Sequence, residues 1–159
     1  MILTLKNKKI LFNKYKLKCA IGKRGTSKKK KEGDNITPKG KFRFLKVYYR
    51  ADKIKKLKTS LKKFKIEKNM GWCDDSRSKK YNQIIKFPFS YSAEHLYRRD
   101  NSYDIVIVLN FNTKPIIKNK GSAIFIHISK KNYRPTKGCV ALSKKDMFLL
   151  LSKLKRRDQ

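Results

Sequence analysis

Short apolar runs alternate with polar positions, mostly lysines, over much of the 159-residue chain. In residues 2–21 the apolar side chains alternate with lysines between Asn-Lys breaks, which predicts two or three short strands joined by hairpins. Residues 42–48 predict another strand. Residues 103–109 are apolar at successive positions, so both faces of this strand are apolar and a central place in a sheet is expected. The pattern predicts a mainly β fold with one domain, residues 1–159.

Helical spacing is confined to a few segments. Residues 51–66 carry apolar side chains at intervals of three or four among lysines, which fits either a short amphipathic helix or a basic loop. Ser92 could cap a short helix carrying His95, for which we expect a structural role. Near the C-terminus, Ser143 stands in an N-cap position with Asp146 three residues later. Apolar residues follow at helical spacing, which predicts a terminal helix.

The segment 22–40 is predicted to be a loop, because glycines punctuate it. Pro38 pre-sets the backbone for a turn that Gly40 can close before the strand at 42–48. An ordinary turn accounts for these residues. It does not account for Glu32 and Asp34, an acidic pair in a very basic chain.

One stretch, residues 122–142, joins two candidate chemical groups. An apolar run delivers His127, a polar loop follows, and a Thr-Lys-Gly-Cys turn ending at Cys139 leads into a second apolar run. A cysteine nucleophile needs an imidazole close in space to take its proton, so this pair indicates nucleophilic catalysis. The alternative is that His127 packs in the core and Cys139 is a small buried side chain.

The chain has 44 Lys+Arg against 11 Asp+Glu, a formal net charge of +33. Such a balance favours an anionic partner, with nucleic acid the first candidate. However, 35 lysines against 9 arginines, with 15 isoleucines and 5 alanines, is also what an AT-rich genome produces. Because the charge is spread along the chain, we interpret it as a solvated surface with non-specific affinity for anionic surfaces, and expect no specific nucleic-acid partner.

The three cysteines, Cys19, Cys73 and Cys139, are far apart, and no CxxC pair exists, which argues against a zinc site. We expect Cys19 to be a core residue of an early strand. The N-terminus is too short and too quickly charged for a secretory signal. No apolar run approaches the roughly 20 residues that span a bilayer, so no transmembrane segment is expected.

Polar and aromatic residues fill the segment 70–104. Trp72, the one tryptophan, precedes Cys73 and two aspartates, and we expect it in a pocket wall. Asp74 and Asp75 have no histidine pair nearby, so we favour a capping or ion-pair role over metal binding.

Three motifs follow one another along the chain. Residues 32–42 read Glu-Gly-Asp-Asn-Ile-Thr-Pro-Lys-Gly-Lys-Phe, and residues 71–75 read Gly-Trp-Cys-Asp-Asp, with Tyr-Asn at 81–82. The third is Ser-Ala-Ile-Phe at 122–125, then His127 and Thr-Lys-Gly-Cys-Val at 136–140. Together and in this order they resemble the YkuD-type L,D-transpeptidase catalytic domain over essentially the whole chain. The chain departs from the common pattern at Lys137, where many members have histidine, at Ala141, and in a shorter His–Cys spacing. These departures concern substrate contacts more than the nucleophile–base pair.

The resemblance implies a β-sandwich or barrel with a few short helices and a C-terminal helix. It implies Cys139 as nucleophile and His127 as general acid and base, with backbone N–H groups at the Gly138–Cys139 turn holding an oxyanion. We expect the cations Lys137 and Arg134 to favour the thiolate. The residues expected to contact substrate are Thr136, Lys137, Arg134 and Trp72. No metal or organic cofactor is implied.

The implied substrate is a peptidoglycan stem tetrapeptide, cleaved after the L-centre of diaminopimelate with loss of D-alanine. An amine of another stem would then form a 3→3 cross-link. Two alternatives remain: a hydrolase trimming the same stems, and a non-enzymatic basic nucleic-acid-binding module. We expect a monomer. The resemblance implies a periplasmic or cell-wall location, whereas the missing signal leaves a cytoplasmic one open.

Overall fold

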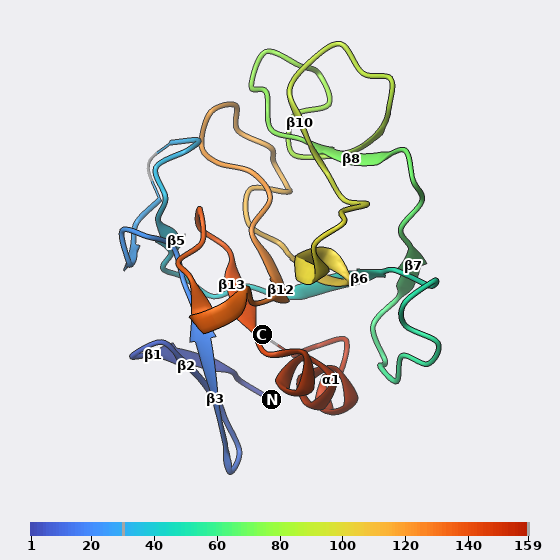
Figure 1. The fold of residues 1–159 in the computed structure, drawn as a ribbon. Helices are drawn as coiled ribbons and strands as arrows, with labels where there is room; N and C mark the ends of the chain where they lie inside the picture. Colours follow the sequence, from blue (N-terminus) through green and yellow to red (C-terminus); the bar gives the residue numbers. More distant parts are fainter. Residues whose placement is uncertain (30, 159) are drawn as a thin grey trace.

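The structure, a computed structural model, describes residues 1–29 and 31–158 and is built around an eight-stranded sheet (Figure 1). In spatial order its strands are β1 (Thr4–Lys6), β2 (Lys9–Phe12), β3 (Tyr15–Ala20), β13 (Val140–Leu142), β12 (Phe125–Ile128), β11 (Ile105–Leu109), β6 (Phe44–Tyr49) and β7 (Lys63–Lys65). Within the described residues β1 and β7 are outer strands, so this sheet does not close into a barrel. The mainly β prediction is confirmed, and the open, layered arrangement fits a sandwich.

The remaining elements are short. A second sheet has the order β10 (Ala93–His95), β8 (Met70–Cys73) and β9 (Ile84–Lys86), and β4 (Thr26–Ser27) pairs with β5 (Thr37–Pro38). Two 3₁₀ turns, η1 (Asn101–Tyr103) and η2 (Lys131–Tyr133), and one α-helix, α1 (Lys144–Lys153), complete the described chain. No helix among these residues is long and apolar enough to span a bilayer.

The predicted hairpins and the predicted central strand are both observed. β1, β2 and β3 form an antiparallel meander, and Cys19 is buried in β3 as expected. All five residues of β11 are buried between β12 and β6. Its Ile105 and Ile107 face one apolar cluster and Val106 and Val108 face another, which is why its sequence lacks polar alternation.

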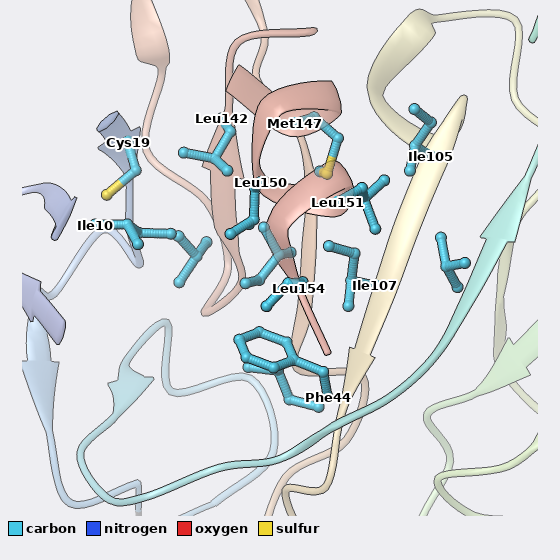
Figure 2. Close-up of a cluster of buried hydrophobic side chains, with 14 of the residues drawn as sticks. Ile10, Cys19, Phe44, Ile105, Ile107, Leu142, Met147, Leu150, Leu151 and Leu154 are labelled. Atoms are coloured by element: carbon cyan, nitrogen blue, oxygen red, sulfur yellow. The ribbon is translucent and has the colours of Figure 1, made fainter. Parts of the chain in front are cut away.

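The main sheet therefore separates two apolar layers. The larger cluster lies between the sheet and α1, and the smaller one lies between the sheet and the paired strands β8 and β10. Figure 1 shows α1 and these strands on opposite sides of β12. Figure 2 shows side chains of α1 directed at those of β11 and β13 across the larger cluster. The site described below lies on the other face of the sheet.

The terminal helix begins as predicted. Ser143 accepts a hydrogen bond from the Asp146 backbone N–H through its hydroxyl, satisfying an N-terminal donor, and Asp146 lies in the first turn. Met147, Leu150 and Leu151 are fully buried against the sheet (Figure 2). The helix ends at Lys153, before the basic residues at 155–157.

The structure decides between the two readings of 51–66 and corrects the helix expected after Ser92. Of the two readings of 51–66, the basic loop is the observed one: Ile54, Leu57 and Leu61 anchor it in the core, and its end pairs with β6 as β7. Ser92 caps no helix, because the following residues form β10, which pairs with β8. In both segments, backbone pairing with a neighbouring strand prevailed over weak local helical spacing.

We predict that Leu150→Ala lowers the free energy of unfolding by about 2–5 kcal/mol, because it removes a fully buried side chain between α1 and the sheet. Leu45→Ala, at a position 42% exposed, is the matched control and should cost less than about 1 kcal/mol. Urea denaturation of both variants measures this. Equal losses would contradict the layer assignment.

Candidate active site

Strand pairing brings His127 and Cys139 to one face of the main sheet. β12 and β13 run parallel, with Ile126 opposite Val140 and His127 opposite Ala141. Side chains alternate along a strand, and Ile126 and Val140 face the larger cluster near α1. His127 therefore faces the opposite side, as does Cys139, which packs against the smaller cluster. The two are diagonal neighbours across the parallel pair, with Ala141 leaving space beside the imidazole.

The hydrogen bond of the imidazole determines its tautomer. His127 is 8% exposed, and its Nδ1 lies 2.9 Å from the carbonyl oxygen of Ile128. A carbonyl only accepts, so Nδ1 carries the proton and Nε2 keeps its lone pair. Burial is the main cause that lowers the pKa of His127 to about 4. The ring is therefore neutral at pH 7, with Nε2 able to act as a base. The edge of Tyr103 packs against it at 5.3 Å between centroids.

The thiol is held as a neutral group. Cys139 Sγ donates to the carbonyl oxygen of Ala123 at 3.0 Å and accepts from the Phe125 N–H at 3.4 Å. Burial raises the pKa of Cys139 to about 12, with Glu94 adding to the rise and Lys29 opposing it. Among the described residues no hydrogen bond joins the thiol to His127 in this state.

The expected stabilisation of a thiolate by Lys137 and Arg134 is wrong for this state. Both side chains are exposed, and neither is among the groups that act on the pKa of Cys139. The charge of Lys29 acts to lower the pKa of Cys139, but burial raises that pKa by more. The Lys29 ammonium is also engaged by Asp34 in a buried ion pair.

The turn before Cys139 is held by two threonines. Thr136 Oγ1 donates to the Cys139 carbonyl at 2.6 Å and accepts from the Gly138 N–H at 3.1 Å. Thr37 Oγ1 donates to the Gly138 carbonyl at 2.8 Å and accepts from the Gly22 N–H at 2.8 Å. Gly138 has φ +142, and a Cβ there would lie 3.0 Å from the Ile36 carbonyl oxygen. Only glycine fits without strain.

The motif at 32–42 therefore also holds the turn before Cys139, through Thr37. Asp34, which turn chemistry did not explain, accepts from the buried Lys29 ammonium and from the Ile36 N–H, which orders the backbone that leads to Thr37. Glu32 accepts from the hydroxyl of Tyr81. Both acidic residues are therefore engaged by the fold.

The residues at 81–82 support the segment that holds the thiol. Asn82 Oδ1 accepts from the Ala123 N–H at 3.0 Å, and its Nδ2 donates to the carbonyls of Phe111 and Asn112. Tyr81 Oη accepts from the Gly121 N–H at 3.0 Å. Ala123 has φ +50, an uncommon conformation that these bonds hold. Its carbonyl is the acceptor for the Cys139 thiol.

One cavity of about 940 Å³ joins most of the predicted site residues. Those that line it are His127, Arg134, Thr136, Lys137, Gly138 and Cys139. Trp72 is not in its wall. Its side chain is 4% exposed, its Nε1 donates to Asn82 Oδ1 at 3.0 Å, and its ring edge packs on Phe125 at 5.0 Å between centroids. Trp72 therefore supports the site through Asn82 and Phe125 and does not line the cavity.

Several residues of the site gave no signal in the sequence. The carbonyls of Ile128 and Ala123 act through the backbone, and Tyr103 and Glu94 come from segments without a spacing motif. Of these, Glu94 alone could have been named as a candidate site residue, because it is one of few acids in a basic chain. Asp75 pairs with Arg77 at 2.6 Å, as expected for an ion-pair role. In the described part of the chain, no three His, Cys, Asp or Glu side chains gather as metal ligands.

The sequence profile of the YkuD family, described as L,D-transpeptidase catalytic domain, matches residues 1–159. No curated protein and no solved structure matches the chain significantly.

We predict that stability falls as the pH drops from about 6.5 to about 4 because of His127. Its pKa is about 4 in the folded protein, below the ordinary 6.5, so the unfolded state binds more protons in this window. The loss from this group is at most about 3 kcal/mol. Urea denaturation of His127→Gln should show a shallower pH dependence than the wild type, whereas His95→Gln keeps it. Identical slopes for all three would contradict the burial of a neutral imidazole.

We predict that Gly138→Ala moves Cys139, because φ +142 is strained for alanine and its Cβ would crowd the Ile36 carbonyl. Labelling of Cys139 by a substrate-like acylating agent should slow by about tenfold or more, in line with a misplacement of about 1 Å. Gly33→Ala is the control, since its Cβ has open space at a similarly positive φ. Equal labelling rates for the two variants would show that the turn tolerates a side chain.

Proposed function

Since the chain belongs to the YkuD family of L,D-transpeptidase catalytic domains, we propose that it is a cysteine acyltransferase acting on peptidoglycan stem peptides. The observation that supports this most is the placement of His127 and Cys139. They share one sheet face and one cavity, with a neutral thiol and an imidazole whose Nε2 is unprotonated.

The first half-reaction forms a thioester. The thiol rotates from the Ala123 carbonyl towards Nε2 of His127, and Sγ attacks the substrate carbonyl as its proton moves to the ring. We place proton transfer in the same step as attack, because pKa values of about 12 and about 4 disfavour a separated thiolate and imidazolium. The protonated ring then delivers its proton to the leaving amine.

The oxyanion is assigned to the Cys139 N–H. The neighbouring Gly138 N–H is already taken by Thr136 Oγ1, so this sequence-derived donor is engaged in the fold. A backbone donor aimed at a developing oxyanion typically contributes about 3 kcal/mol. Thr136 thereby shapes the turn, and Arg134 and Lys137, exposed at the cavity rim, can hold substrate carboxylates.

The acyl donor we propose is a stem tetrapeptide, with diaminopimelate contributing the carbonyl and D-alanine leaving. Capture of the thioester by an amine of a second stem gives a 3→3 cross-link, and capture by water gives trimming to a tripeptide. Both share each step up to the thioester. We favour transfer over hydrolysis.

The high positive charge does not require a nucleic-acid function. In the N-terminal meander Lys9 lies opposite both Lys6 and Lys18, which places cations side by side without acids between them. Such rows attract anionic polymers in general, with strong dependence on salt. They lie apart from the cavity, since none of these lysines lines it.

We predict that a carbapenem acylates Cys139, as that drug class does in this family, and that intact mass shows one adduct on the wild type. Cys139→Ala should fold and give none, and Cys73→Ala, which removes a buried cysteine outside the cavity, should keep the adduct. His127→Ala should slow acylation by roughly 10²–10⁴-fold. Folded wild type without an adduct, or an adduct that persists in Cys139→Ala, would overturn the proposed function.

A further inference from the structure

Three carboxylates line the catalytic cavity in addition to the groups of the proposed mechanism, and one of them, Glu32, accepts from the Tyr81 hydroxyl. Asp74 follows β8 and Glu94 lies in β10, and both are in the wall of the cavity that contains Cys139. Glu94 lies opposite Trp72, two positions before Asp74, so Asp74 and Glu94 are diagonal neighbours on one face of the β8–β10 pair. The Asp74 N–H extends the pairing by donating to the Ser92 carbonyl at 3.3 Å.

Asp74 is not satisfied by the fold. Its Oδ1 is buried and has no hydrogen-bond partner among the described residues. Its neighbour Asp75, by contrast, is bound by Arg77 through side chain and backbone. A buried carboxylate oxygen without a donor destabilises a fold, and one in a cavity wall can accept a hydrogen bond from a ligand.

Glu94 is only partly neutralised. It accepts from the Tyr103 hydroxyl and lies 3.7 Å from Arg98, whose guanidinium is closer to Asp100, at 2.9 Å. Burial is the main cause that raises the pKa of Glu94, and the charge of Asp74 adds to it. The two carboxylates thus repel each other in a partly desolvated wall, and a cation between them would relieve both.

The cavity wall carries charges of both signs. Asp74 and Glu94 lie in it with Lys29 and Arg98, which pair more closely with Asp34 and Asp100. Arg134 and Lys137 come from the loop after η2 and form no ion pair among the described residues, and the charge of Lys137 acts to lower the pKa of Glu94. Glu94 is also near enough to the nucleophile to influence the pKa of Cys139. A ligand cation bound by Asp74 and Glu94 would therefore lie beside the thioester. A primary ammonium fits, because it supplies one positive charge and three donors to two carboxylates.

We propose that Asp74 and Glu94 form the binding site of the acyl acceptor, which enters as a primary ammonium and is thereby selected over water. The assignment rests on the proposed function and decides between its two outcomes, transfer and hydrolysis. The acceptor reacts as the neutral amine, so the ammonium first releases one proton to the carboxylate pair. Its nitrogen forms the new C–N bond as the C–S bond to Cys139 breaks. The second nitrogen proton passes through His127 to the sulfur.

The test measures how the thioester is partitioned. Wild type, Asp74→Asn and Glu94→Gln are each given a stem tetrapeptide as donor and a diaminopimelate-containing stem tripeptide as acceptor. Mass spectrometry quantifies cross-linked dimer against hydrolysed donor. We expect the transfer-to-hydrolysis ratio to fall at least tenfold in both variants, with a higher KM for the acceptor. Glu67→Gln removes an equal charge at an exposed position outside the cavity and should leave the ratio unchanged.

Thermal unfolding separates this role from a structural one. Because Asp74 Oδ1 has no bond to lose, Asp74→Asn should unfold at the same temperature as the wild type or higher. A ratio unchanged in both variants, or a wild type that hydrolyses the donor and transfers nothing at millimolar acceptor, would overturn the acceptor site while leaving the cysteine chemistry intact. A wild type that neither consumes donor nor forms a carbapenem adduct would overturn the proposed function, and the acceptor site with it.

Discussion

The site depends on the parallel pairing of β12 with β13. This register places His127 opposite Ala141 and carries Cys139 to the level of Phe125, on the face away from α1. Parallel strands need a crossover, and here residues 129–139 make it through η2 and the Thr-Lys-Gly-Cys turn. A register shift of one residue would send the imidazole or the thiol into the larger apolar cluster. The buried β11 pairs with β12 on its other edge, so β12 is a central strand of the sheet.

Burial sets the chemistry of the pair. The same desolvation that lowers the pKa of His127 raises that of Cys139, so the resting site holds two neutral groups rather than an ion pair. In the proposed function, such a pair needs a substrate carbonyl in the cavity before proton transfer and attack occur together. The Ala123 carbonyl keeps the thiol in place until then, and the Asn82 side chain holds that backbone.

The sequence predicted the elements whose signals are local and strong. The apolar run of β11, the early hairpins and the capped helix at Ser143 all follow from pattern and capping chemistry. The segment 51–66 was open to two readings, and the helix expected after Ser92 was wrong, because strand pairing with distant residues decided both conformations. The motif residues His127 and Cys139 could be named, but their shared face depends on register, which spacing alone does not give. Trp72 was expected in the pocket wall and instead packs behind it on Phe125. The acceptors at Ala123 and Ile128 are backbone carbonyls, which do not depend on side-chain identity, so the sequence contains no signal for them.

The central claim is that the buried His127 ring is neutral, with Nδ1 donating to the Ile128 carbonyl and Nε2 unprotonated. The most direct measurement is ¹⁵N nuclear magnetic resonance of the imidazoles, which is simple in a chain with 2 histidines. His127→Gln assigns the signals. At pH 7 the account predicts a neutral His127 ring with the proton on Nδ1. A ring protonated on both nitrogens, or one carrying its proton on Nε2, would contradict it.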